Sequence, residues 1–299
     1  MSCFCDKFSN KHTFNIPASS DQDKGKSWEK DGVTFFAVCD GHGDNGHDYA
    51  NFVIDFLFEN FSLVNLQIED LTETINNIID NLENECKKHI GHKIGGTTLS
   101  LIIQTKDYNW IVNIGDSDIV HFDCVKKNYT ILSEDHSPDN ISEFKRIISK
   151  NKDTVFEYGK SYDDKNTYSL YEKEKDEWIK KKVPPNIPKK NVEGKYAYYI
   201  GNGIQDRLAM TRSIGDFGFK EKYGVSYKPY ITKIPKLEKG CSLIVATDGF
   251  WDCWKYDEIL SVIVNGRVLK MEEYHNIRSK QVFGNSRDDS LFYYVEFEH

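Results

Sequence analysis

The sequence is organised around the stretch TFFAVCDGHG, residues 34–43. The aromatic and β-branched residues from Phe35 to Val38 predict a buried strand. This strand leads directly into Asp40, Gly41 and His42, and glycine lets the backbone bring a carboxylate and a free carbonyl close to a cation. The stretch therefore indicates either the edge of a metal site or an ordinary turn after a strand, because so short a motif also occurs by chance.

Length, composition and charge limit the functions open to this chain. Its 299 residues are 39% hydrophobic, enough for one large domain or two small ones, and it carries 47 acidic against 39 basic residues, a formal net charge of −8. This charge argues against nucleic acid as a partner. No segment has the apolar length of a membrane span, and the N-terminus lacks the pattern of a secretory signal. We therefore expect a soluble, cytoplasmic protein that is a monomer.

The seven cysteines are an odd number without the spacing of a disulfide framework. We therefore predict reduced thiols in an intracellular protein. The pair Cys3 and Cys5 leaves open a second interpretation, in which these two thiols are metal ligands.

Periodicity predicts an alternation of helices and strands. Apolar residues recur at helical spacing from Tyr49 to Phe61 and from Leu71 to Ile90, which predicts two amphipathic helices after the corner. Short apolar runs with tight connections then predict antiparallel strands, and a short helix and a later one are expected at 141–149 and 254–264. The predicted strands span 98–104, 110–114, 119–123, 129–132, 208–210, 230–234, 243–246 and 291–297.

Residues 151–203 differ from the rest in composition, because Lys, Asp, Glu, Tyr and Asn dominate there. We predict a mobile surface insertion that does not belong to the core. The lysine run 180–182 within it has two interpretations: a solvated helix end before the prolines that follow, or a docking patch for an acidic partner.

Carboxylates recur at the ends of predicted strands. Asp116 lies in the turn Gly-Asp-Ser-Asp, Asp248 follows the strand 243–246, and Asp288 precedes the last strand. Together with Asp40 they would form an oxygen-rich site, which suits Mg²⁺ or Mn²⁺ rather than zinc. Because such carboxylates repel one another without a cation, a metal pair that activates a water for phosphoester hydrolysis would explain their gathering.

The order of motifs resembles the metal-dependent serine/threonine protein phosphatases of type 2C, over nearly the whole chain. This resemblance implies an α+β fold of two packed antiparallel β-sheets flanked by helical layers, with residues 1–299 as a single phosphatase domain and a flap-like insertion at about 151–203. The motifs that carry it are VCDGHG (38–43), GGTT (95–98), NIGDS (113–117), DHSP (135–138), LAMTRSIGD (208–216), ATDGFWD (246–252) and SRDD (286–289).

The resemblance also implies roles for single residues. Asp40 looks like the carboxylate that bridges two metal ions, with the carbonyl of Gly41 on one ion and with Asp248 and Asp288 around the other. Asp116 looks like the ligand of a weaker third ion, shared with Asp248.

Five other residues match the family's motifs outside these ligands. Asp23, and with it Gln22, would hold metal-bound waters. His42 resembles a general acid toward the leaving oxygen, or else is a loop histidine bonded to the backbone. For Arg212 and Asp216 we predict structural support rather than contact with substrate.

Three positions depart from the family's pattern. Ala18 stands where the family usually has an arginine that grips the substrate phosphate, and Lys11 or Lys24 could fill that role instead. Asp118 and Asp289 replace an arginine and an asparagine. The carboxylates that match the family's metal ligands are all present.

Two functions follow from this resemblance. The first is a phosphatase with two Mg²⁺ or Mn²⁺ ions, and a third weaker ion, that hydrolyses phosphoserine and phosphothreonine in protein substrates. The second is a pseudophosphatase or phosphoprotein-binding module with low turnover, which the absence of the arginine at Ala18 favours.

Overall fold

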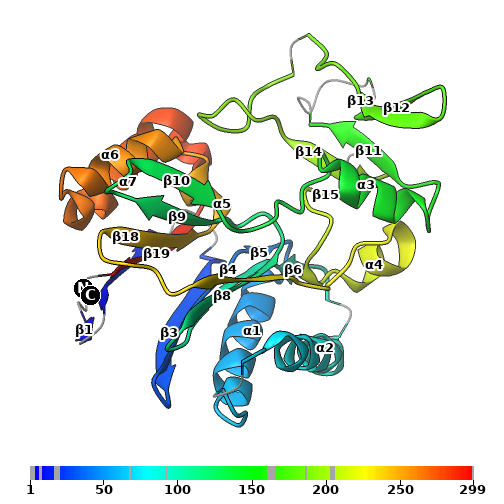
Figure 1. The fold of residues 1–299 in the computed structure, drawn as a ribbon. Coiled ribbons are helices and arrows are strands. Elements are labelled where there is room, and N and C mark those ends of the chain that lie inside the picture. Colours follow the sequence, from blue (N-terminus) through cyan, green and yellow to red (C-terminus); the bar gives the residue numbers. More distant parts are fainter. Residues whose placement is uncertain are drawn as a thin grey trace.

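The computed structural model describes residues 4–6, 9–16, 21–66, 69–91, 93–159, 166, 168–185, 187–202 and 206–297. Two antiparallel sheets pack face to face, and helices cover the outer face of each sheet (Figure 1). The α+β class that we expected, with two packed sheets flanked by helices, is confirmed.

The two large sheets contain most of the strands. The six-stranded sheet has the order β1 (Phe4–Asp6), β2 (Ser9–Ile16), β19 (Ser290–Phe297), β18 (Cys241–Ala246), β9 (Ile119–Asp123) and β10 (Asn128–Ile131). The five-stranded sheet has the order β17 (Tyr230–Pro235), β8 (Tyr108–Ile114), β7 (Leu99–Gln104), β4 (Val33–Cys39) and β3 (Lys24–Lys30). Neighbouring strands within both sheets run antiparallel.

Two helical layers enclose the sheets. The five-stranded sheet is covered by α1 (Gly46–Phe61) and α2 (Thr72–His89), shown in blue and cyan in Figure 1. The six-stranded sheet is covered by α6 (Tyr256–Val264) and α7 (Met271–Phe283). The shorter helical elements are α3 (Ile141–Ile148), α4 (Phe217–Tyr223), α5 (Asp248–Trp251), η1 (Val268–Lys270) and η2 (Gly284–Ser286).

Strand β4 shows why its sequence is an unbroken apolar run. Side chains alternate between the two faces of a strand, so Phe35 and Ala37 pack under the helices α1 and α2 while Phe36 and Val38 pack between the sheets. Both faces are therefore buried, and neither position tolerates a polar residue without loss of apolar burial. The run holds the site-bearing corner, which begins at Asp40, on the most buried part of the fold.

A small sheet and a flap complete the structure. The small sheet has the order β16 (Ile214–Gly215), β6 (Gly96–Thr97) and β5 (Gly41–His42). The flap contains a sheet of β11 (Val155–Tyr158), β14 (Tyr198–Gly201) and β15 (Arg207–Leu208), and a hairpin of β12 (Tyr171–Glu174) and β13 (Glu177–Lys180).

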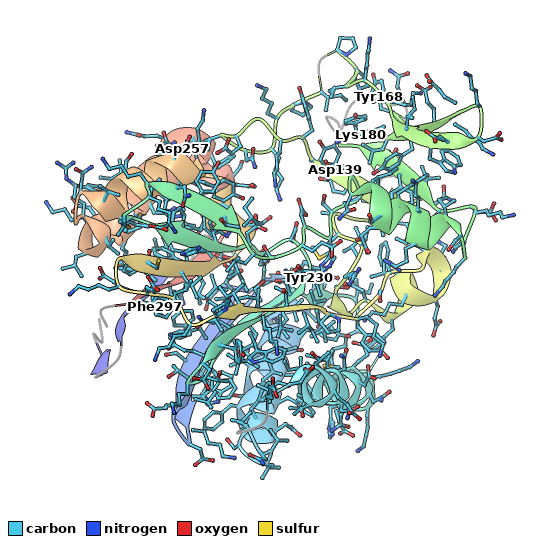
Figure 2. The ribbon with its side chains drawn as sticks, viewed as in Figure 1. Asp139, Tyr168, Lys180, Tyr230, Asp257 and Phe297 are labelled. Carbon is cyan, nitrogen blue, oxygen red and sulfur yellow. The ribbon has the colours of Figure 1, made fainter. Side chains whose placement is uncertain are left out.

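The insertion 151–203 lies outside the three main apolar clusters of the domain, but it is not without packing. Its apolar side chains form a cluster of their own with α3, in which the rings of Tyr171 and Phe144 stack with centroids 3.9 Å apart. The lysine run is also not a helix end: Lys180 closes β13, and its ammonium group contacts Asp139 at 2.7 Å (Figure 2). Polar composition concealed this cluster because its aromatic residues are separated along the sequence by charged and polar ones.

The two long helices after the corner and the helices expected at 141–149 and 254–264 are confirmed, whereas β2, β3 and α7 are among the elements that were missed. The described residues before Asp31 include β2 and β3, and β3 is an edge strand with only Trp28 buried. Helix α7 buries Met271, His275 and Ser279, a stripe at helical spacing that is mostly polar and therefore gave no apolar signal.

Two further predictions concern cysteines and membranes. Cys39, Cys86, Cys124, Cys241 and Cys253 are free thiols, as predicted, whereas the side chains of Cys3 and Cys5 lie outside the described residues. Within the described ranges, none of the helices has both the length and the apolar character that crossing a bilayer requires.

Candidate functional site

The carboxylates predicted from the sequence lie at one end of the two sheets. Asp40 follows β4 and Asp23 precedes β3, and the register Lys24↔Cys39 places these two strand ends side by side. The same holds for the six-stranded sheet: Asp248 follows β18 and Asp288 precedes β19, with Ala246 opposite Phe292.

Asp116 joins the same end of the structure from a turn. This turn connects β8 to β9, and β9 pairs with β18 through Ile119 and Val245. Five carboxylates that are distant in sequence are thus gathered because antiparallel register aligns the strand ends that carry them.

Close backbone approach explains the glycines of the motifs. A Cβ on Gly41 would lie 2.6 Å from the carbonyl oxygen of Gly46, and one on Gly249 would lie 1.9 Å from that of Asp289. No larger residue fits either position without moving the chain.

The threonines of the GGTT motif fix the backbone of Asp40. Thr98 donates its backbone N–H to the carbonyl of Asp40 at 2.9 Å, and its hydroxyl oxygen accepts from the N–H of Asp40 at 3.1 Å. Thr97 donates its hydroxyl to the same carbonyl at 3.0 Å. Thr97 and Thr98 therefore hold the backbone of Asp40 in place through hydrogen bonds to both its N–H and its carbonyl group.

Burial and mutual repulsion dominate the electrostatics of the cluster. Burial, followed by the neighbouring carboxylates of Asp248 and Asp23, holds the pKa of Asp40 well above its usual range. Burial likewise raises the pKa of Asp288 to about 6, with Asp248 adding to the shift. In the absence of a cation these groups resist ionisation, which is the expected state of a metal-ligand set without its metal.

Asp23 and Asp248 differ in the contacts that counter the effect of burial on their pKa values. Burial raises the pKa of Asp23 against the effect of Thr247, whose hydroxyl donates to Asp23 Oδ2 at 2.7 Å. Burial also disfavours the charged form of Asp248, but the ammonium group of Lys190 and a hydrogen bond donated by the Asp40 carboxyl outweigh it and lower its pKa.

Lys190 is the residue that the sequence gave no reason to expect here. Its Nζ lies 2.6 Å from Asp248 Oδ2, 3.6 Å from Asp252 Oδ2 and 4.0 Å from Asp116 Oδ2. It reaches the cluster from the flap, and no motif marked it. Asp252 was quoted within a motif but was given no role.

The donor chemistry of the cluster fits a hard divalent ion, since every candidate side-chain ligand is a carboxylate oxygen. Asp116 Oδ1 is buried and has no hydrogen-bond partner. Nevertheless, in the part of the chain that the structure describes, no three carboxylate, histidine or cysteine side chains form a closed ligand set around one point. The ammonium group of Lys190 compensates part of the negative charge, and the raised pKa of Asp40 favours its neutral form, which hydrogen-bonds Asp248.

His42 is held by Asp216 rather than by the backbone. Its Nε2 lies 2.6 Å from Asp216 Oδ2, and Ser213 donates its hydroxyl to the same oxygen at 2.6 Å. Burial lowers the pKa of His42, but the Asp216 carboxylate outweighs this effect and raises it above the usual value. The other ring nitrogen, Nδ1, is buried without a hydrogen-bond partner.

Asp216 therefore contacts the candidate acid directly, which the sequence did not indicate; that it supports the structure and does not contact substrate stays a prediction. Its carboxylate fits beside Gly96, where a Cβ would lie 2.3 Å from Asp216 Oδ2. The glycine in the GGTT motif thus makes room for the partner of His42.

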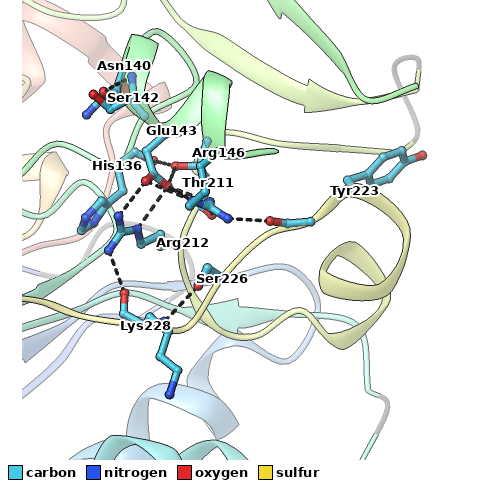
Figure 3. A network of polar contacts seen from close by, with 12 residues as sticks. His136, Asn140, Ser142, Glu143, Arg146, Thr211, Arg212, Tyr223, Ser226 and Lys228 are labelled. Atoms are coloured by element: carbon cyan, nitrogen blue, oxygen red, sulfur yellow. Dashed lines mark hydrogen bonds and ion pairs between the residues drawn. The ribbon is translucent and has the colours of Figure 1, made fainter. Parts of the chain in front are cut away.

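Arg212 does have the structural role that we predicted. It donates to Glu143 from Nη2 at 2.6 Å and from Nε at 3.1 Å, and its Nη1 donates to the carbonyl of Lys228 (Figure 3). Arg146 and the hydroxyl of Thr211 contact the same carboxylate. This network ties α3 to the segment between β15 and β17 and does not reach the carboxylate cluster.

The departures from the expected motifs are structural where the structure describes them. Asp118 is buried and accepts hydrogen bonds from Ser133 and from the hydroxyl of Tyr256. Asp289 accepts the backbone N–H of Gln22 at 3.1 Å and so anchors the segment that carries Asp23.

The candidates for phosphate binding outside the cluster are largely untested by the structure. Ala18, and the side chain of Lys11, lie outside the described residues. Lys24 pairs with Asp21 at 3.4 Å.

Comparison with known families decides the ancestry. The family model described as "Protein phosphatase 2C" matches residues 5–158 and 190–283. This chain belongs to the protein phosphatase 2C family. The two matched segments leave out residues 159–189 between them, which lie within the insertion expected at 151–203.

Curated relatives in the protein phosphatase 2C family are distant. The chain is 26% identical over 221 residues to "Probable protein phosphatase 2C 35" of Arabidopsis thaliana. The aligned region covers 74% of this chain and 60% of that protein. The chain is also 26% identical over 270 residues to "Probable protein phosphatase 2C 28" of the same plant, covering 88% and 63%. The chain thus spans less than two thirds of the length of these relatives.

Solved structures of the protein phosphatase 2C family share the fold. A serine-threonine phosphatase 2C from Toxoplasma gondii superimposes with a TM-score of 0.72 at 17% identity, covering 99% of this chain and 97% of that one. The catalytic domain of the serine/threonine phosphatase PstP, solved in complex with two manganese ions, superimposes with a TM-score of 0.60 at 13% identity, covering 98% and 99%.

Proposed function

We propose that this protein is a metal-dependent protein serine/threonine phosphatase that hydrolyses phosphoserine and phosphothreonine in protein substrates. One observation carries the proposal: five carboxylates meet at aligned strand ends, where burial and mutual repulsion raise the pKa of Asp40, Asp23 and Asp288. A protein gains nothing in stability from such a cluster unless cations bind it. The two manganese ions of PstP support this reading.

The chain's residues take the following roles in the proposal. Asp40, the carbonyl of Gly41, Asp248 and Asp288 would hold two divalent ions, and Asp116 would hold a weaker third ion. The ions, Mg²⁺ or Mn²⁺, would supply an activated water and the positive charge that holds phosphate oxygens. Asp23, fixed by Thr247, orients waters at the edge of the cluster.

His42 donates a proton toward the leaving seryl or threonyl oxygen. The Asp216 carboxylate keeps the ring protonated over a wider pH range, because it raises the pKa of His42. Because Nε2 is engaged by Asp216 and Nδ1 is buried, the ring has to turn when substrate binds.

A second function has one observation in its favour. Lys190 already neutralises part of the cluster from the flap, which suits a phosphoprotein-binding module with low turnover. This module would bind a phosphopeptide without releasing phosphate.

Phosphate release from a phosphothreonine peptide and from an aryl phosphate separates the two functions. We expect turnover with Mn²⁺ or Mg²⁺, none with chelator, and loss of at least about a hundredfold in Asp40→Asn. The matched control is Asp55→Asn, which removes an exposed carboxylate on α1. Peptide binding without phosphate release in any metal would contradict the phosphatase and support the binding module.

A further inference from the structure

A turn of the flap crosses directly over the carboxylate cluster. We call residues 189–196 the strap; it is closed by the bridge between Lys189 and Tyr196 and by the hydrogen bond from Lys190 N to the carbonyl of Lys195 at 2.7 Å. Between the strap and the body of the protein lies a cavity of about 160 Å³, bordered by Asp116 and Trp251 among others.

Several contacts among the described residues hold the strap to the body. Val192 donates its backbone N–H to the carbonyl of Asp252 at 3.1 Å, and the carboxylate of Glu193 accepts the backbone N–H of Tyr256 at 3.3 Å. The side chain of Asn191 forms a hydrogen bond with the carboxyl group of Asp252, and Lys195 pairs with Asp135 at 3.4 Å. Lys190 also contacts the body, and it brings a positive charge to the carboxylate cluster.

Lys190 lies where a cation is needed. Among the ion pairs of the described residues, it is the only cation that pairs with Asp116, Asp248 or Asp252. Its side chain is 32% exposed, so it reaches inward from the surface and is not a packed part of the core. Asp116 and Asp248 are the same two carboxylates that the family resemblance implies for the weakest metal ion.

Electrostatic repulsion prevents an ammonium group and a divalent ion from binding the carboxylate oxygens of Asp116 and Asp248 at the same time. Lys190 Nζ lies 2.6 Å from Asp248 Oδ2, whereas Mg²⁺ and Mn²⁺ approach carboxylate oxygens to about 2.1 Å. Two cations placed that close repel strongly in a partly buried site. Binding of one therefore disfavours binding of the other.

We propose that the ammonium group of Lys190 takes the place of a divalent ion between Asp116 and Asp248, so that docking of the strap and binding of the weakest metal ion exclude each other. This inference rests on the proposed function, because it presumes that the cluster binds divalent ions. At low metal concentration Lys190 would hold the strap against the cluster, and binding of the last ion would release the strap. Among the described residues, no other side chain of the strap forms an ion pair with Asp116, Asp248 or Asp252.

Metal binding to variants of the strap tests the proposal without any measure of activity. Isothermal titration with Mn²⁺ should show that Lys190→Ala binds the weakest ion at least about fivefold more tightly than the natural protein. Lys190→Arg, which keeps the charge, should behave like the natural protein. Lys189→Ala is the matched control, since Lys189 is the exposed neighbour on the same strap.

Hydrogen exchange supplies the second readout. Saturating Mn²⁺ should accelerate exchange of the Val192 amide, which donates to the carbonyl of Asp252 in the body, in the natural protein, while Lys190→Ala should show fast exchange of this amide already in chelator. Unchanged or slower exchange with Mn²⁺ would overturn the proposal that metal binding releases the strap.

The outcomes separate this inference from the proposed function. Equal Mn²⁺ affinities and stoichiometries in Lys190→Ala, Lys189→Ala and the natural protein, with tight binding intact, would overturn the role of Lys190 alone. Absence of tight Mn²⁺ binding in all of them would overturn both this role and the proposed metal-dependent activity.

Discussion

At the scale of single residues, the carboxyl group of Asp40 opposes folding when no cation is present. Burial raises its pKa well above the usual range, so at neutral pH the folded protein must either take up a proton or hold an unfavourable charge. The carboxyl donates a hydrogen bond to Asp248 in its protonated form. The candidate site therefore reduces the stability of the fold that carries it.

Asp40→Asn should accordingly stabilise the protein in chelator. The amide of asparagine can donate the same hydrogen bond to Asp248 without taking up a proton, and we expect the melting temperature to rise by about 2–6 °C. Addition of Mn²⁺ should then stabilise the natural protein and not the variant. Scanning calorimetry measures both, with Asp55→Asn as control; a lower melting temperature in chelator would contradict this account of the cluster.

His42→Gln tests the proposed proton donor. We expect kcat on a phosphopeptide to fall by roughly a hundredfold with little change in KM, because the histidine acts on the leaving group and not on binding. Circular dichroism should show an unchanged fold. A large rise in KM with kcat preserved would assign His42 to substrate binding instead.

The sequence could predict most of the site's residues but not its charge balance. The motifs that carry Asp40, Asp116 and Asp248 are local, so their positions at strand ends follow from strand prediction alone. Lys190 becomes part of the site only through the path of the flap, which no local pattern encodes. The contact between His42 and Asp216 likewise depends on β5 and β16, which are more than a hundred residues apart in sequence and both pair with β6.

At the scale of elements, the carboxylate of Glu143 joins α3 to the segment that follows β15. Burial alone would raise the pKa of Glu143, but hydrogen bonds from Arg212 and Arg146 outweigh burial and lower it from 4.5 to about 2 (Figure 3). A carboxyl with this pKa difference contributes at most about 3 kcal/mol to folding.

The pH dependence of Glu143→Gln checks this contribution. Because the folded-state pKa is lowered, the stabilisation is present above pH 4.5 and is lost as the pH falls toward about 2. We therefore expect the variant to lose about 2–3 kcal/mol at pH 7, and the difference from the natural protein to shrink below pH 4. Urea denaturation at both pH values measures it; a difference that is independent of pH would show that packing, not charge, is lost.

The flap has its own small core, and Tyr171→Ala tests whether it folds as a separate unit. The ring stacks on Phe144, and its hydroxyl donates to the carbonyl of Pro138 at 3.0 Å. Removal of both contacts should lower the free energy of unfolding of the flap by about 3 kcal/mol. Hydrogen exchange should then quicken in β11 and β14 but stay unchanged in β4.

Lys173→Ala is the control for this variant, because Lys173 is an exposed residue of the same hairpin. Faster exchange throughout the two large sheets of Tyr171→Ala would show that the flap is not a separate unit. Equal exchange in the flap of both variants would show that Tyr171 does not hold it.

Elements with an unambiguous apolar period were predictable, and the others were not. The helices α1 and α2 carry long apolar stripes against the five-stranded sheet. Strand β3 has one buried side chain and α7 buries a histidine and a serine, so the forces that place them are contacts with neighbours and not their own composition. The flap's core is similarly assembled from side chains of α3, β12 and β14 that are distant in sequence.

At the scale of the whole molecule, the fold supports the site through three apolar layers. One lies between the sheets and one lies under each pair of helices. The central strands β4 and β18 are buried on both faces, and they end in Asp40 and Thr247–Asp248. The buried strands thus provide the base of the site, while the strap of the flap contacts the cluster from outside both sheets through Lys190.

The central claim is that the carboxylates at these strand ends gather to bind divalent ions. An anomalous difference map from crystals of the natural protein grown with Mn²⁺ tests it most directly. We predict two strong peaks at about 2.1 Å from carboxylate oxygens, one between Asp40 and Asp248 and the other on Asp40. A map without peaks at this cluster at saturating Mn²⁺, or with peaks only at surface carboxylates such as Asp55, would contradict the account.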